Sequence, residues 1–385
     1  MRFKDYKTDC PTVPSELNSI YMAGADVGEL EIEYVTDALK NGWYENKYYY
    51  CETLQKEFAA YHNRKYALMT PNCTTSIHLI LAALGIEEGD EVIVPECTWI
   101  ASVSPVKYQK ATPVFCDIEK DSWCLDPESV KKAITEKTKA IIVVDLFGNM
   151  PNMDALQQIC DEHGLYLIED AAEALGSSYK GTKAGKFGVA STFSFHNTKT
   201  MTTGEGGMLL LDDDDLYDKC VKLRDHGRGP NTKPYYNDIV GFKYMPFNVQ
   251  AALGLAQFHR VDELITNKKA QYLFYKQNLS DLDLQFNHEP PHVFNSAWIT
   301  AIVLGDSYDI DKHEFMRLLN ERGVPTRPFF YPLTSIPAFD MEEEHINKNV
   351  NAYQISARGF NLPGAANLTE EQLKFVCDGI RSVLA

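Results

Sequence analysis

The sequence predicts an α/β fold, with a large domain built on a mostly parallel sheet flanked by helices and a smaller C-terminal α+β domain. Short, nearly continuous apolar runs, such as residues 112–115, 140–147 and 165–170, alternate with segments of helical periodicity. Polar and small residues follow several of these runs, where ligands bind in open α/β sheets. The alternation changes near residue 260, and we therefore place the two domains at 1–260 and 261–385.

Length and composition are those of an ordinary globular protein. The 385 residues are enough for two cores, with 44% hydrophobic and 24% charged residues. The net charge of −17 disfavours a nucleic-acid partner but leaves an anionic small substrate open, because local groups decide binding. The nine cysteines are scattered and form no C-x-x-C pair, which favours reduced thiols in the cytoplasm over disulfides or a metal site.

No targeting or membrane segment is predicted. The N-terminal residues MRFKDYKTDC lack an apolar core of signal-peptide length. No stretch of about 18 consecutive apolar residues occurs that could span a membrane.

The first part of the chain predicts helices at 28–39 and 52–61 and a strand at 66–69. A polar turn follows the strand and contains Cys73, Thr74 and Thr75, and a helix begins at Ile77. Free amides and the helix dipole at such an N-terminus favour a phosphate group. Plain N-capping by a hydroxyl side chain is the alternative interpretation of this turn.

Trp99 follows the next strand, at residues 91–94. It could lie in the hydrophobic core or line a pocket. Two further strands, at 112–115 and 140–147, precede a helix at 151–163.

Asp170 ends the apolar strand 165–170, and Glu173 lies three residues beyond it, about one turn if this segment is helical. A carboxylate at a strand end can hold a pyridinium nitrogen protonated, which pyridoxal phosphate (PLP) requires to act as an electron sink. A helix cap or turn is the alternative role for Asp170.

Lys199 is a single amine between two predicted strands, in the segment STFSFHNTKTMTTGEGG at residues 191–207. A lysine held in such a turn can lose solvation and act as a nucleophile toward an aldehyde. A surface lysine in a β-turn is the alternative. The order of Asp170, Ser194 and Lys199 in one chain favours the catalytic interpretation.

The remaining chain predicts helices at 216–227, from 248 toward 274, at 311–322 and at 369–383, with strands at 294–304 and 324–330. The last strand contains Arg327, with Tyr331 directly after it. These two side chains could pack in the interior or line a substrate pocket.

Several segments resemble the DegT-type, PLP-dependent sugar aminotransferases of fold type I. They are EDAAEALGSSYKG, the run around Lys199 and GFKYMPFNVQAALGLAQ, and the run RPFFYPL resembles the GDP-perosamine synthase branch. The resemblance extends from about Gly28 to the C-terminus.

The resemblance assigns site residues. It implies that Lys199 binds PLP and shuttles a proton, while Asp170 holds the ring nitrogen protonated. Trp99 would stack on the ring, Glu173 would lie near its 3-hydroxyl, and Ser194 would contact the phosphate. Cys73 stands where the family has glycine in its phosphate-binding turn. Lys243 stands where the family has an asparagine that reaches the partner subunit's PLP.

The same resemblance implies a cytoplasmic homodimer with shared active sites. It would transfer the amino group of L-glutamate to a nucleotide-linked 4-keto-6-deoxyhexose, with GDP-4-keto-6-deoxymannose expected first. A family member acting on dTDP- or UDP-linked 4-keto-6-deoxyglucose is one alternative. A catalytically silent sensor or interaction protein is another. A sugar dehydratase is disfavoured, because such relatives have histidine where Lys199 stands.

Overall fold

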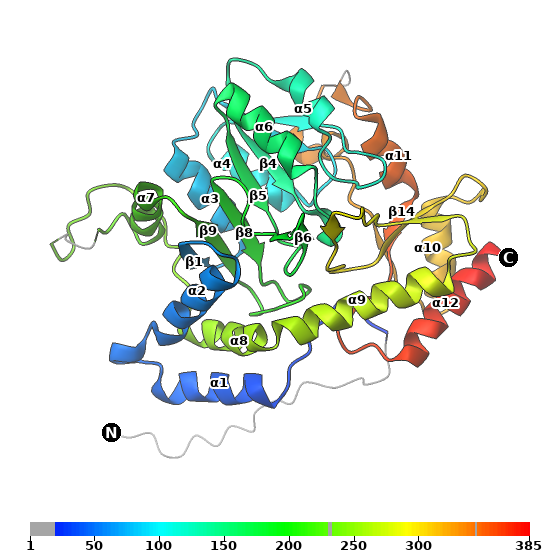
Figure 1. Cartoon of the computed structure of the whole chain (residues 1–385), viewed down its shortest axis with the longest axis horizontal. Coiled ribbons are helices and arrows are strands. Elements are labelled where there is room, and N and C mark those ends of the chain that lie inside the picture. The colour runs from blue at the N-terminus through cyan, green and yellow to red at the C-terminus, as the bar shows by residue number, and fades with distance from the viewer. Residues whose placement is uncertain (1–19, 230–232, 343–344) are drawn as a thin grey trace.

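A seven-stranded sheet runs through the middle of the molecule (Figure 1), in the order β1-β9-β8-β5-β4-β2-β3. The computed structural model describes residues 20–229, 233–342 and 345–385. Strands β3, β2, β4, β5 and β8 are parallel, whereas β9 is antiparallel to both of its neighbours. The predicted mostly parallel sheet is therefore confirmed. Its strands are β1 (Tyr66–Thr70), β2 (Glu91–Pro95), β3 (Thr112–Cys116), β4 (Thr138–Val144), β5 (Tyr166–Asp170), β8 (Ala190–Ser194) and β9 (Gly207–Leu211).

Both faces of this sheet are buried. Successive residues of a strand point to opposite faces, so each strand contributes side chains to two cores. In β4, Ile141 and Val143 join one core, while Ala140 and Ile142 join the other. This explains the continuous apolar runs in the sequence. The first core is covered by α1 (Glu29–Asn41), α2 (Tyr49–Tyr61), α5 (Pro127–Ala133), α6 (Met153–His163) and α8 (Asn248–His259). The second is covered by α3 (Cys73–Leu84), α4 (Ser104–Tyr108) and α7 (Asp214–Arg224).

A third core lies in the C-terminal part of the chain, around a four-stranded antiparallel sheet in the order β10-β12-β14-β13. Helices α9, α10 and α12 contribute Tyr275, Phe315 and Val376 to it. The elements here are α9 (Val261–Asn278), β10 (Leu284–Phe286), β12 (Ala301–Leu304), α10 (Lys312–Glu321), β13 (Arg327–Pro328), α11 (Val350–Arg358), β14 (Gly359–Asn361) and α12 (Glu370–Leu384). A small third sheet joins β6 (Ser178–Tyr179), β7 (Thr182–Lys183) and β11 (Val293–Phe294).

Three local predictions were wrong. The helix predicted from 248 toward 274 is two helices, because Arg260 leaves helical geometry between them and forms ion pairs with Asp26 and Glu31. The strand predicted at 294–304 is interrupted by a turn in which Ala297 has a positive φ of 54°. The strand predicted at 324–330 is reduced to β13. The division into domains at residue 260 stays a prediction, and its boundary falls at the break between α8 and α9.

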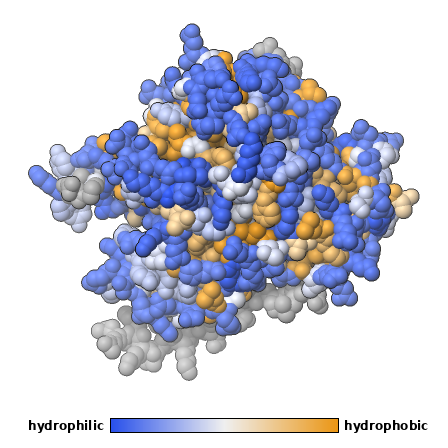
Figure 2. Space-filling model, viewed as in Figure 1, coloured by the Kyte–Doolittle hydropathy of each residue, from blue (hydrophilic) through white to orange (hydrophobic). Residues whose placement is uncertain are grey.

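The surface in Figure 2 is mainly hydrophilic, with apolar residues gathered toward the middle of the visible face. Within the described ranges, no helix combines the length and apolarity of a membrane span. No group of acidic, histidine and cysteine side chains there is arranged to hold a metal ion. Eight of the nine cysteines are buried free thiols, and Cys10 lies outside the described residues.

Candidate active site

A cavity of about 470 Å³ opens beside the carboxyl ends of β5 and β8 and the N-terminus of α3. This is the edge of the sheet at which ligands bind in open α/β folds. Segments that are far apart in the sequence, from Asn72 to Phe330, contribute to its wall. The polar and aromatic lining residues are Asn72, Cys73, Thr74, Thr98, Trp99, Ser102, Asp170, Glu173, Ser194, His196, Thr198, Lys199, Glu205, Trp298, Arg327 and Phe330.

The N-terminus of α3 presents main-chain donors to the cavity. Asn72 caps the helix, since its Oδ1 accepts a hydrogen bond of 2.9 Å from the amide of Thr75. The amides of Cys73 and Thr74 have no hydrogen-bond partner among the described residues. Gly207 of β9 lets the strand pass against this helix end, because a Cβ there would lie 2.4 Å from the carbonyl carbon of Asn72. The arrangement suits an anion.

Asp170 is the last residue of β5 and is 3% exposed. Its Oδ2 accepts a hydrogen bond of 2.7 Å from the hydroxyl of Ser102. Its Oδ1 accepts one of 3.1 Å from the amide of Ala172 and lies 3.6 Å from the thiol of Cys73. Burial raises the pKa of Asp170, and the hydroxyl of Ser102 is the strongest of the opposing contacts. The carboxylate is thus held in one orientation facing the cavity.

Lys199 and Glu173 form a buried ion pair in the lining of the same cavity. The Nζ atom of Lys199 lies 3.1 Å from Oε1 of Glu173 and 3.8 Å from the ring centroid of Trp298. Burial raises the pKa of Glu173, while the Lys199 charge opposes that rise. The indole of Trp298 is itself fixed, because its Nε1 donates to the carbonyl of Thr198 over 2.7 Å. The amine therefore has a defined position.

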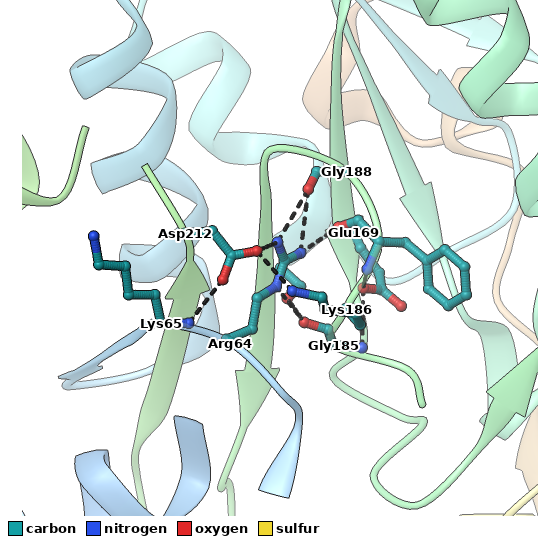
Figure 3. Close-up of polar contacts among 9 residues, drawn as sticks. Arg64, Lys65, Glu169, Gly185, Lys186, Gly188 and Asp212 are labelled. Carbon is teal, nitrogen blue, oxygen red and sulfur yellow. Dashed lines mark hydrogen bonds and ion pairs between the residues drawn. The ribbon is translucent and has the colours of Figure 1, made fainter. Parts of the chain in front are cut away.

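Behind the cavity, a polar cluster fixes the turn that leads into β8 (Figure 3). Arg64 lies between Asp212 and the turn Gly185–Gly188, and its Nε donates to the carbonyl of Gly185 over 2.8 Å. On the other side of the turn, Glu169 accepts from the amide of Gly185 over 2.9 Å. Because Glu169 precedes Asp170 in β5, this cluster locks β5 and β8 in register.

The structure brings most of the predicted site residues to one cavity: Cys73, Thr74, Trp99, Asp170, Glu173, Ser194, Lys199 and Arg327. Three lie outside its lining. Thr75 is engaged in the cap of α3, with its hydroxyl donating to the carbonyl of Asn72. Lys243 is paired with Asp225 over 2.8 Å, and Tyr331 stacks on His313.

Eight of the polar and aromatic cavity residues carried no role in the sequence prediction: Asn72, Thr98, Ser102, His196, Thr198, Glu205, Trp298 and Phe330. Ser102 stands three residues after Trp99, and His196 stands three before Lys199, so proximity to predicted site residues could have indicated both. Phe330 is adjacent to Tyr331 in the RPFFYPL run. Trp298 had no such signal, because the turn at 295–300 brings it to Lys199 only in the folded chain.

Comparison with known proteins identifies the family to which the chain belongs. Residues 25–381 match the DegT/DnrJ/EryC1/StrS aminotransferase family. The GDP-perosamine synthase of Vibrio cholerae is 39% identical over 91% of this chain and 95% of its own length. That of Caulobacter vibrioides is 37% identical over 96% of this chain and 100% of its own length.

A solved structure extends the comparison to the fold. Spr1654 of Streptococcus pneumoniae, in its PLP form, superposes with a TM-score of 0.88 at 26% identity. The match covers 95% of this chain and 98% of that chain. This likeness confirms the predicted fold type I architecture.

Proposed function

Since the chain belongs to the DegT/DnrJ/EryC1/StrS aminotransferase family and is a PLP-dependent sugar aminotransferase, we propose that it transfers the amino group of L-glutamate to C4 of GDP-4-keto-6-deoxymannose. The juxtaposition of Lys199 and Asp170 in one cavity is the observation that carries the proposed roles within the site. The printed activity of the Vibrio and Caulobacter relatives supports the choice of substrate.

The donor set of the cavity fits PLP. The free amides of Cys73 and Thr74 and the hydroxyl of Ser194 would hold the phosphate. Asp170 would hold the ring nitrogen, Glu173 would face the ring hydroxyl, and Trp99 would cover the ring. Trp99 is 58% exposed, which leaves one aromatic face available for such a contact. Cys73 keeps the main-chain donation of the family's glycine turn, because only its amide is required.

When bound, PLP supplies an electron sink that stabilises negative charge at the substrate carbon. Lys199 has the chemistry to bind the cofactor aldehyde and then to carry a proton at its Nζ atom. Glu173 and Trp298 hold this amine in place between uses. Asp170 would place a negative charge beside the ring nitrogen, and its burial would strengthen that interaction.

Substrate binding is assigned to the side of the cavity formed by Arg327 and Phe330. Arg327 has no ion pair within the described ranges, so its guanidinium is available for an anionic group. We include Tyr331 in this proposal because it lies directly beyond these residues with 46% of its surface exposed. An anionic sugar nucleotide can bind to a chain of net charge −17 through such local cations.

A homodimer with shared active sites is part of the proposal. Exposed aromatic residues support it, since Trp43, Tyr44 and Phe247 are 45%, 85% and 53% exposed, and Trp43 and Phe247 lie side by side. Lys243 lies outside its own cavity with its side chain 53% exposed, so it is available to reach a partner's phosphate site. The eight buried thiols fit a reducing compartment, and we place the reaction in the cytoplasm.

Three measurements test the proposal. GDP-, dTDP- and UDP-linked 4-keto-6-deoxy sugars, assayed side by side with L-glutamate as donor, should give the highest kcat/KM with the GDP-linked mannose derivative. A higher kcat/KM with the dTDP- or UDP-linked sugar would change the proposed substrate but not the proposed reaction.

Borohydride treatment of the PLP-bound protein, followed by peptide mass spectrometry, should place the cofactor on Lys199. Lys199→Ala should lose about 1,000-fold or more in turnover with its fold intact.

Turnover of Lys199→Ala within a few-fold of the wild type would refute the proposed role of this amine. A purified protein that stays colourless with added PLP, and that turns over none of the three sugars, would favour the sensor alternative.

A further inference from the structure

The turn that presents Trp99 to the cavity also contacts Asp170 through Ser102. This turn begins at Thr98 and continues through the short 3₁₀ segment η2 (Ile100–Ser102). Trp99 is on its exposed side, whereas Thr98 and Ser102 are each 3% exposed. The hydroxyl of Ser102 reaches Oδ2 of Asp170 over 2.7 Å across 68 positions of sequence.

The direction of the hydrogen bonds among Thr98, Ser102 and Asp170 follows from the number of hydroxyl hydrogens available to donate. An ionised carboxylate only accepts, so Ser102 uses its single hydroxyl hydrogen for Asp170. The hydroxyl of Thr98 lies 3.1 Å from that of Ser102 and must therefore be the donor between the two. The result is a directed chain from Thr98 to Ser102 to Asp170.

The two oxygens of Asp170 are not held equally. Oδ1 has a main-chain donor, the amide of Ala172, which no side-chain substitution removes. The side-chain hydrogen bond to Oδ2 comes from Ser102, and a hydroxyl bound to an ionised group forms a short, strong bond. The thiol of Cys73, 3.6 Å from Oδ1, is a weaker donor. Among the side chains that contact this carboxylate, Ser102 is thus the strongest hydrogen-bond donor.

We propose that Ser102, oriented by Thr98, is a positioning residue that keeps the Asp170 carboxylate charged and directed at the cofactor ring nitrogen. This inference rests on the proposed function, because it assigns Asp170 to that nitrogen. Without the hydroxyl, Asp170 is a buried carboxylate with one oxygen lacking a donor, and such a group takes up a proton more readily. A protonated Asp170 no longer offers a negative charge to the ring.

The test measures binding of PLP to the apo-protein by absorbance titration across pH 5 to 9. Ser102→Ala should weaken PLP binding about tenfold at neutral pH, the usual size for a lost hydrogen bond to a charged group. As the pH is lowered, the affinity of Ser102→Ala for PLP should begin to fall at a higher pH than that of the wild type, which shifts the acid limb of its profile. The ionisation of free PLP is common to every variant, so a shift between variants reports the protein.

Two variants serve as controls. Ser102→Thr keeps the hydroxyl and should follow the wild type. Ser104→Ala removes a hydroxyl from the same region, where it bonds the carbonyl of Ile100 over 3.1 Å and lies outside the cavity lining, and it should also follow the wild type.

Thr98→Val keeps Ser102 but removes its orienting donor, and it should weaken PLP binding about threefold with a smaller shift of the acid limb.

The outcomes separate this inference from the proposed function. Failure of the wild-type protein to bind PLP would overturn the proposed function itself. Binding by the wild type, with Ser102→Ala unchanged in affinity and pH profile, would overturn the positioning role alone. If Ser102→Ala does not fold, the comparison of Thr98→Val with Ser102→Thr decides, and equal pH profiles in these two would overturn the role.

Discussion

The amine of Lys199 lies 3.1 Å from a carboxylate oxygen of Glu173, and these side chains keep only 14% and 5% of their surface exposed. A buried ion pair is strongly coupled, because removing one partner leaves the other charge without compensation. The pair thus holds the reactive amine in place before PLP arrives. If Lys199 bonds to the PLP aldehyde as proposed, its amine would depend less on the negative charge of Glu173.

Glu173→Gln should destabilise the apo-protein by about 2–4 kcal/mol, because it removes the negative charge that pairs with the buried Lys199 ammonium. The loss should be smaller in the PLP-bound protein, where the amine is engaged. Thermal unfolding of both forms measures the difference. Glu128→Gln is the matched control, since its exposed pair with Lys131 should be worth less than about 0.5 kcal/mol. Equal losses in apo and PLP-bound protein would contradict the argument.

Asp170→Asn should lower kcat by about 100-fold or more, while the melting temperature changes by only a few degrees. The amide keeps the shape of the side chain and can still accept from Ala172. It cannot supply the negative charge that the ring nitrogen requires. Parallel measurement of turnover and thermal unfolding distinguishes the two effects. A large loss of melting temperature with near-normal turnover would make Asp170 a structural residue.

Arg64→Lys should destabilise the protein by about 2–4 kcal/mol. The guanidinium bonds the carbonyls of Gly185 and Phe187 over 2.8 and 2.6 Å and pairs with Asp212, and one ammonium cannot reach all three. Lys65→Ala, which removes only an exposed pair with Asp214, is the control and should change stability little. Denaturant titration monitored by circular dichroism measures both. Similar midpoints for the two variants would argue against the cluster in Figure 3 as a structural clamp.

His62 should make the protein sensitive to mild acid. It is 1% exposed, and burial lowers its pKa to about 3. In the unfolded chain this histidine takes up a proton near pH 6.5, whereas in the folded protein it stays neutral until about pH 3. Folding stability is therefore fully present above pH 6.5 and falls as the pH is lowered from 6.5 toward 3. The loss at pH 5 relative to pH 7 should be about 2 kcal/mol.

His62→Gln should be less stable at neutral pH, because the ring packs on Phe58 and Phe193. Its stability should nevertheless fall less steeply between pH 7 and 5. Denaturant midpoints at the two pH values, compared between variant and wild type, give the slope. Identical slopes would mean that His62 does not take up the proton.

The central sheet could be predicted from the sequence because burial on both faces leaves a continuous apolar run. Strands such as 165–170 carry that signal without any tertiary information. The break at Arg260 could not, since apolar periodicity continues on both sides of it and the break depends on ion pairs with Asp26 and Glu31.

The candidate site was also predictable from the sequence only in part. The positions of Asp170 and Lys199 in the cavity were predictable, because Asp170 ends one strand and Lys199 follows another, at the edge of the sheet where ligands bind. The contact of Ser102 with Asp170 and that of Trp298 with Lys199 join residues far apart in sequence. Nothing in local composition marks such pairs. Resemblance to a family supplied the cofactor, and no residue pattern alone specifies the nucleotide.

Trp298 and Arg327 complete the cavity, yet the ribosome adds them after every strand of the central sheet has been made. A nascent chain can therefore assemble the sheet while its reactive lysine still faces an open edge. Any product truncated before Trp298 carries the nucleophile without the aromatic surface that holds it.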